Sequence, residues 1–89
     1  MIKVAYDSSF KRSYKRKVPV GSEREFKFRT KLEAFMNDPF DKTLRTHKLS
    51  GKLKEYWSVS IEYDLRVIFY FEDAETAVFV DLGTHKEVY

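Results

Sequence analysis

The spacing of apolar residues changes near the middle of the chain, and this change limits the folds that the chain can adopt. Between residues 56 and 63, apolar and more polar side chains alternate, which is typical of a β-strand with one buried face. The apolar positions of this strand are Trp57, Val59, Ile61 and Tyr63. Two later segments, 66–71 and 76–82, are dense in β-branched and aromatic residues and predict a buried central strand and a last strand.

The first half of the chain has the longer spacing of helices. An apolar segment at residues 2–6 predicts a short strand. After it, Phe10, Tyr14 and Val18 recur four residues apart, so that they share one face of a helix. An aspartate and two serines precede this helix as capping residues, and a proline and a glycine follow it.

A second helix is predicted to begin at Ser22, where Ser22 and Glu25 fit a capping box, and to end before Pro39. The two helices are expected to run antiparallel on one face of the sheet, because neither can bury its apolar stripe alone. The prediction is an α+β fold in one domain, residues 1–89: an N-terminal strand and two helices on an antiparallel sheet of about four strands, with a further short strand around 46–49. The core is expected to include Trp57, Ile61, Val67, Phe69 and Val80.

Composition excludes several kinds of protein. The chain has no cysteine, which removes disulfides and thiolate metal sites, and only two histidines. No apolar run approaches the roughly 20 residues of a membrane span, and the first residues do not form a signal peptide, so we expect a cytoplasmic protein with no membrane partner. The net charge is +3, and ten of the seventeen Lys and Arg residues lie in residues 1–31. Such a field attracts polyanions.

Arg66 begins an otherwise apolar strand, and two interpretations are open for it. As a structural residue it pairs with Glu62 or Asp64, as strand-end arginines often do. As a functional residue its guanidinium clamps a phosphate and stabilises charge that develops in a transition state. His85 follows the last strand; a surface histidine is usually inert, but an imidazole is well suited to proton transfer near neutral pH.

A basic run at residues 47–54 leads into the alternating strand that begins near residue 56. It is either a solvated hairpin or a cationic surface for a phosphate backbone, and Lys48, Lys52 and Lys54 are the candidate RNA-binding residues. The sequence has no glycine-rich phosphate loop, no HExxH and no paired cysteines, so no metal or cofactor is predicted. A metal-free nuclease can still cut RNA, because the 2′-hydroxyl of the substrate is itself the nucleophile.

Three stretches of the second half combine into a pattern. Residues 47–58 contain H-x-L-x-G and W-S, residues 61–69 contain E-Y-D-x-R, and residues 83–89 read G-T-H-x-E-x-Y. In this order and spacing they resemble the C-terminal half of the RelE superfamily of bacterial toxins, and in particular its YafQ branch. The N-terminal strand and helical pair agree with that family in order and length.

The resemblance implies a small toxin that cleaves messenger RNA, often in the ribosomal A site, and that is held in check by a cognate antitoxin encoded beside it. By position, His85 matches the terminal histidine proposed as a general acid or base, and Arg66 matches the arginine that supports the phosphate. Asp64 and His47 match further active-site positions of the YafQ branch. Tyr89 matches the terminal aromatic residue, which can stack on a base.

Two positions depart from the family pattern. Ser60 stands where YafQ-like toxins can have another catalytic histidine, and Leu65 stands where an aromatic residue can follow the aspartate. The general base is therefore either Asp64 or His47, with His85 as the acid. Two alternatives to a ribonuclease remain: a non-catalytic toxin of the ParE kind that binds and inhibits DNA gyrase, and an inactive chain that only binds an antitoxin.

Overall fold

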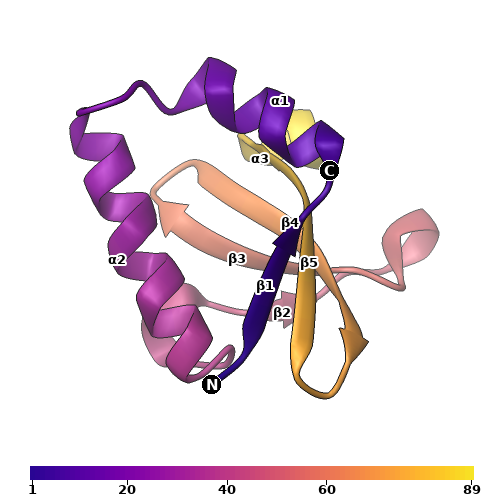
Figure 1. The fold of residues 1–89 in the computed structure, drawn as a ribbon. Coiled ribbons are helices and arrows are strands. Elements are labelled where there is room, and N and C mark those ends of the chain that lie inside the picture. Colours follow the sequence, from indigo (N-terminus) through magenta and orange to yellow (C-terminus); the bar gives the residue numbers. More distant parts are fainter.

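The alternating half of the chain forms three consecutive antiparallel strands in the computed structural model, which describes residues 1–89 (Figure 1). They are β3 (Trp57–Glu62), β4 (Leu65–Asp73) and β5 (Thr76–Gly83), joined by tight turns. Tyr63 was expected on the apolar face of β3 but lies in the β3–β4 turn, where it is 98% exposed. The strand ends one residue earlier than the alternation suggested.

Two further strands extend the sheet at its edges. β1 (Lys3–Tyr6) pairs with β5 in parallel, and β2 (His47–Lys48) pairs with β3 antiparallel, which gives the order β1-β5-β4-β3-β2. The predicted α+β class is confirmed, and β2 is the further short strand expected around 46–49. The sheet is mixed rather than antiparallel, because β1 is parallel to β5. A parallel pair needs a long connection, and the chain between β1 and β5 supplies it.

The two long helices begin at the predicted capping residues. In α1 (Ser8–Lys17) the Asp7 carboxylate accepts the N–H of Phe10 at 2.9 Å. In α2 (Glu23–Asn37) the Ser22 hydroxyl accepts the N–H of Glu25 at 3.1 Å. The other half of the expected capping box is displaced by one residue, because the Glu25 carboxylate accepts the N–H of Gly21. Each helix therefore still satisfies an otherwise unpaired N–H at its first turn.

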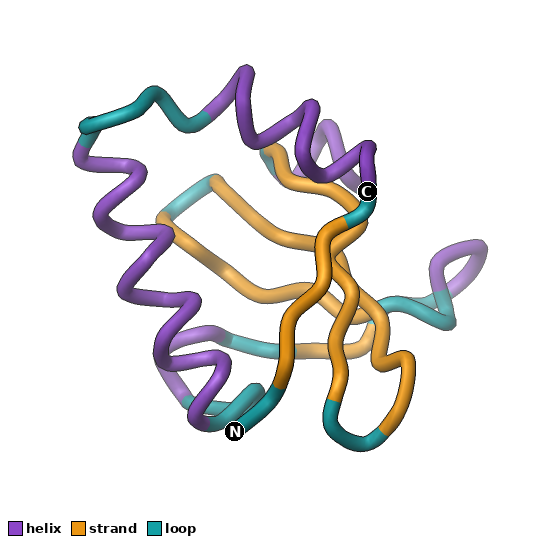
Figure 2. The backbone as a smooth tube through the Cα atoms, viewed as in Figure 1, coloured by secondary structure: helices purple, strands orange, loops and turns teal.

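Both helices cover the same face of the sheet. α1 packs mainly on β5, whereas α2 packs on β3 and on the 3₁₀ turn Lys42–Leu44. In Figure 1 they meet at a steep angle rather than lying side by side, and Figure 2 shows the loop that turns the corner between them. A third helix, α3 (His85–Val88), follows β5 where the sequence predicted only a tail. No helix is long and apolar enough to cross a membrane.

The core lies between the helices and the sheet. Its centre is Phe35 of α2, whose ring contacts those of Phe69 and Phe79 edge-on, at centroid distances of 5.0 and 5.3 Å. Of the predicted core residues, Ile61, Val67 and Phe69 are buried, and Trp57 packs half-buried against the cluster. The prediction for Val80 is wrong. The β4–β5 register shifts at this point, so Val80 is the extra residue of a bulge and stays partly exposed.

Candidate functional site

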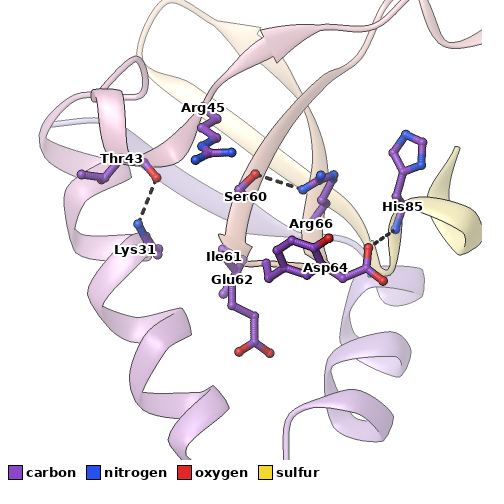
Figure 3. A pocket seen from close by; sticks show the side chains of 10 residues that line it. Lys31, Thr43, Arg45, Ser60, Ile61, Glu62, Asp64, Arg66 and His85 are labelled. Carbon is purple, nitrogen blue, oxygen red and sulfur yellow. Dashed lines mark hydrogen bonds between the residues drawn. The ribbon is translucent and has the colours of Figure 1, made fainter.

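A polar cavity of about 540 Å³ lies where β3 turns into β4 (Figure 3). One wall comes from the sheet and the chain after β5, and carries Ser60, Asp64, Arg66 and His85. Three of the predicted catalytic residues, Asp64, Arg66 and His85, are thus brought together although 21 residues of chain separate the first from the last. Local backbone structure explains how each of them is held.

Arg66 does not form the ion pair that the structural interpretation expects. Its guanidinium donates a hydrogen bond to the Ser60 hydroxyl at 3.1 Å, on the strand directly opposite. Glu62 is occupied instead by Arg24 at 2.5 Å and Lys27 at 3.5 Å, and the hydrogen bond from Arg24 holds the pKa of Glu62 below its usual value. The remaining N–H groups of Arg66 are therefore available to a ligand in the cavity.

Asp64 and His85 touch through the backbone. The Asp64 carboxylate, in the β3–β4 turn, accepts the main-chain N–H of His85 at 3.3 Å. In Figure 3 the imidazole of His85 extends away from this contact, to the same side of the sheet as the guanidinium of Arg66. Asp64 therefore fixes the start of α3 and leaves both ring nitrogens of His85 without a protein partner.

α3 is tied down by interactions that the sequence reasoning missed. The Thr84 hydroxyl accepts the N–H of Glu87 at 3.2 Å, and the Glu87 carboxylate accepts the N–H of Thr84 at 2.8 Å. Lys17 of α1 donates to the same carboxylate at 2.6 Å, and this bond is the main cause that lowers the pKa of Glu87 from 4.5 to about 2. The signal was present, because T-x-x-E is the capping-box pattern.

The terminal aromatic residue connects the two histidines. The ring of Tyr89 meets that of His85 edge-on at 4.3 Å and that of His47 at 6.4 Å between centroids. Its hydroxyl donates to the hydroxyl of Ser58, which is buried. Nδ1 of His47 lies 3.0 Å from the carbonyl oxygen of Arg45, which can only accept, so this nitrogen carries the proton and Nε2 is left unprotonated in the neutral ring.

His47 and Tyr89 lie beside the cavity, and the three predicted RNA-binding lysines do not line it. Lys48 lies on β2 with its Nζ 5.8 Å from the centre of the Trp57 ring. Lys52 and Lys54 lie in or next to the 3₁₀ turn Gly51–Leu53, within a loop that projects from the sheet in Figure 1. Their role in RNA binding stays a prediction.

The second wall of the cavity was not predicted. It carries Lys31 of α2 and Thr43 and Arg45 of the segment before β2. Arg45 has φ 51° and ψ 42°, a left-handed conformation for which glycine or asparagine would have been the sequence signal. Leu65, one of the two departures from the family pattern, is buried in the core and does not line the cavity, whereas Asp64 and Arg66 on either side of it do.

No group of three or more His, Asp or Glu side chains is arranged to hold a metal ion. The chemistry that the cavity offers is that of a fixed cation, a carboxylate and an imidazole close together. These groups suit a phosphodiester, since the cation can neutralise a phosphate oxygen while the other two move protons.

The comparisons with known proteins agree in both sequence and fold. The family model for the bacterial YafQ toxin of type II toxin–antitoxin systems matches residues 2–89. The structure is similar to that of YafQ from E. coli strain BL21(DE3), with a TM-score of 0.80, 18% identity and coverage of 100% of this chain and 99% of that one. It is also similar to a chain of the E. coli DinJ–YafQ toxin–antitoxin complex (TM-score 0.78, 18% identity, coverage 99% and 97%).

A YoeB/ParE toxin from Agrobacterium tumefaciens has the same fold, with a TM-score of 0.78, 16% identity and coverage of 94% of this chain and 99% of that one. No curated protein matches the sequence. Because these structures share less than a quarter of their residues with the chain, they bear on its fold, whereas the family model bears on its sequence over nearly the whole length.

Proposed function

The chain belongs to the YafQ family of toxins from bacterial type II toxin–antitoxin systems, and on this premise we propose that it is an endoribonuclease that inhibits translation by cleaving messenger RNA. Cleavage takes place in the cytoplasm, in the ribosomal A site, and needs no metal ion or other cofactor. The observation that carries the proposal is that the guanidinium of Arg66, which has no carboxylate partner, lies in one cavity with Asp64 and His85. An arginine with only a structural role would form an ion pair with Glu62, whose side chain is 22% exposed and which lies on β3, the strand paired with β4.

The reaction is a transesterification within the RNA. The 2′-hydroxyl loses its proton to a general base, and its oxygen bonds to the adjacent phosphorus. The bond from phosphorus to the 5′-oxygen of the next nucleotide breaks, and His85 as the imidazolium gives that oxygen a proton. The products are a 2′,3′-cyclic phosphate and a 5′-hydroxyl. Arg66 stabilises the extra negative charge on the phosphorane.

Asp64 is the general base that the geometry favours over His47. Asp64 lines the same cavity as Arg66 and His85, whereas His47 lies beside it and contacts His85 only through Tyr89. The rings of Tyr89 and His85 pack perpendicular to each other, and the Tyr89 hydroxyl donates a hydrogen bond to Ser58. We therefore assign Tyr89 a positioning role for His85, and this tyrosine, which is 40% exposed, can also stack on a base of the substrate.

A cognate antitoxin is the expected protein partner. In E. coli, YafQ forms a toxin–antitoxin complex with DinJ, and one chain of that complex has the fold described here. The cavity of this chain contains cations without a carboxylate partner, which suits an acidic segment that folds on binding and covers the site. The test is co-purification with the product of the adjacent reading frame, and failure of the two proteins to associate would contradict this part of the proposal.

The ribonuclease is tested by primer extension on a translated messenger RNA after a brief pulse of expression. Discrete cuts are expected for the wild type, and they should vanish for His85→Ala and Arg66→Ala. Arg16→Ala is the matched control, since Arg16 is an exposed arginine of α1 outside the cavity and should leave the cuts unchanged. A His85→Ala protein that is folded and cuts as fast as the wild type would remove the central claim.

Two further results would redirect the assignment. If Asp64→Asn still cuts and His47→Gln does not, His47 is the base. If growth stops without any cuts, and the pure protein inhibits supercoiling by DNA gyrase, the ParE-like alternative replaces the ribonuclease.

A further inference from the structure

The cations that line the cavity have no carboxylate partner. Lys31, Arg45 and Arg66 line the cavity, and none of them forms an ion pair with a carboxylate. Arg66 donates to the Ser60 hydroxyl, and Lys31 donates to the carbonyl oxygen of Thr43 at 2.9 Å. The side chain of Arg45 is exposed and forms no hydrogen bond with the other lining residues in Figure 3.

The carboxylates of the cavity do not balance this charge. Glu62 is already neutralised by Arg24 and Lys27, which leaves Asp64 as the one carboxylate of the lining without a cationic partner. Three cations therefore face one free carboxylate. A single phosphodiester carries one negative charge, so the scissile phosphate would leave part of the positive charge of the cavity without a counterion.

The positions of the two arginines divide the cavity. Arg66 comes from β4, and Arg45 comes from the segment that leads into β2, on the opposite wall. In Figure 3 their guanidinium groups lie on the two sides of Ser60, and Lys31 lies beyond Arg45 near Thr43. The positive charge of the cavity is therefore spread from Arg66 through Arg45 to Lys31 rather than concentrated at Arg66.

The backbone at Arg45 also indicates that its side chain is used. Arg45 is the only non-glycine residue of the chain with a positive φ. It ends the 3₁₀ turn Lys42–Leu44 in a left-handed conformation, for which glycine would be better suited. A glycine there would supply no charge, whereas an arginine directs a cation into the cavity. Unfavourable backbone conformations of this kind cluster at functional sites.

We propose, as an extension of the proposed ribonuclease function, that Arg45 with Lys31 binds the phosphate next to the scissile phosphate, so that the cavity holds two consecutive phosphates of single-stranded RNA. Arg66 contacts the phosphate that reacts, and Arg45 contacts one that does not. Arg45 is thus a binding residue: it sets the register of the strand in the cavity.

The test is binding of a short fluorescent RNA, made uncleavable by a 2′-deoxy sugar at the cleavage site, measured by anisotropy over a range of salt concentrations. Arg45→Asn removes the charge and tolerates the left-handed backbone. It is expected to lower the slope of log affinity against log salt by about 0.7, the value for one lost phosphate contact on a single strand. The matched control is Lys42→Gln, an exposed lysine of the same turn that does not line the cavity, and its slope should equal that of the wild type.

A second RNA carries a neutral methylphosphonate in place of the phosphate next to the cleavage site. The wild type should bind it more weakly than the normal RNA, and the difference between the two RNAs should be smaller for Arg45→Asn, in which only Lys31 is left at that phosphate. Equal slopes for Arg45→Asn and Lys42→Gln, or additive losses from the variant and the methylphosphonate, would overturn the second subsite. If the wild type gives these binding results but does not cut the all-ribose RNA or a translated messenger RNA, the nuclease function fails while the subsite stands. A wild type that binds neither RNA overturns both.

Discussion

The core and the cavity are built from neighbouring residues of the same strands, yet their side chains differ in their contacts. Core side chains pack against each other, whereas the cations of the cavity form no ion pair within the protein. On β4, Leu65 and Val67 point into the core and are buried, while Arg66 between them faces the cavity. Core rings such as Phe35 and Phe69 contact each other at 5.0 Å. The cations of the cavity have no carboxylate partner in the protein. Changes in the core should therefore alter stability, and changes in the cavity should alter binding and catalysis.

Phe69→Ala is expected to have the largest effect, on stability. Phe69 is 0% exposed and its ring contacts those of Phe35, Phe71 and Phe79, so truncation leaves a void that the neighbours cannot fill. The free energy of unfolding should fall by about 3–5 kcal/mol, measured by urea denaturation. In a domain of this size that is a large part of the total stability.

The control for this prediction is Phe40→Ala. Phe40 also contacts aromatic rings, those of Trp57 and Phe71, but it is 54% exposed. Its truncation should cost much less than that of Phe69. Equal losses from the two variants would mean that burial on the helix side of the sheet does not dominate the stability of this fold.

Arg66→Ala is expected to lower activity with little effect on stability, the opposite of Phe69→Ala. The rate of RNA cleavage should fall by about 10² to 10³-fold, the cost of removing one preorganised group that stabilises the transition state. The melting temperature should change little, because the side chain makes a single hydrogen bond, to Ser60. Single-turnover cleavage and thermal melting of the same preparation check both parts, with Arg66→Lys as a variant that keeps the charge but loses the planar fork. A large drop in melting temperature would show that Arg66 belongs to the structural set after all.

The same contrast explains what the sequence could predict. The core follows from periodicity: the alternation at residues 57–61 and the fourfold spacing of Phe10, Tyr14 and Val18 each report one buried face. Periodicity carries no information on the direction of β1 at the far edge or on the bulge at Val80, because both depend on which strand lies alongside. The α+β fold class was therefore predictable from the sequence, whereas the direction and register of strand pairing were not.

The cavity was predictable only on its sheet wall. Asp64, Arg66 and His85 stand at strand ends that a β-hairpin brings together, and a family motif covers them. Lys31 and Arg45 reach the cavity from a helix and an irregular segment. Nothing in the local sequence distinguishes them from the other basic residues of the chain, since what sets them apart is their place in the cavity lining, a property of the folded structure.

Tyr89 lies between the core and the cavity, and Tyr89→Phe is expected to change stability less than Phe69→Ala. The phenol of Tyr89 is hydrogen-bonded to Ser58, which is 1% exposed and has no other side-chain partner. Removing the hydroxyl should lower the free energy of unfolding by about 1 kcal/mol, measured by urea denaturation. The same change at Tyr63, which is 98% exposed, should have no measurable effect. Identical stabilities for the two variants would mean that the chain end is not docked on the sheet in solution.

The smallest effect is expected from Glu87→Gln and appears only in acid. The pKa of Glu87 is lowered in the folded protein from 4.5 to about 2, chiefly by the hydrogen bond from Lys17. A carboxylate with a lowered pKa stabilises the folded state fully above its unfolded value, and the contribution is lost as the pH falls from about 4.5 towards 2. Glu87→Gln cannot titrate, so its stability should decline less steeply than that of the wild type over this window.

The measurement is the urea midpoint of both proteins at intervals across that window, at low salt, because the ion pair is exposed and salt screens it. Glu33→Gln is the control, an exposed carboxylate outside any ion pair, and its curve should stay parallel to that of the wild type. Parallel curves for Glu87→Gln as well would mean that Lys17 does not hold α3 in solution. The backbone contact between Asp64 and His85 would then be the tie that places the histidine in the cavity, and Asp64→Asn would affect both the base and the position of the acid.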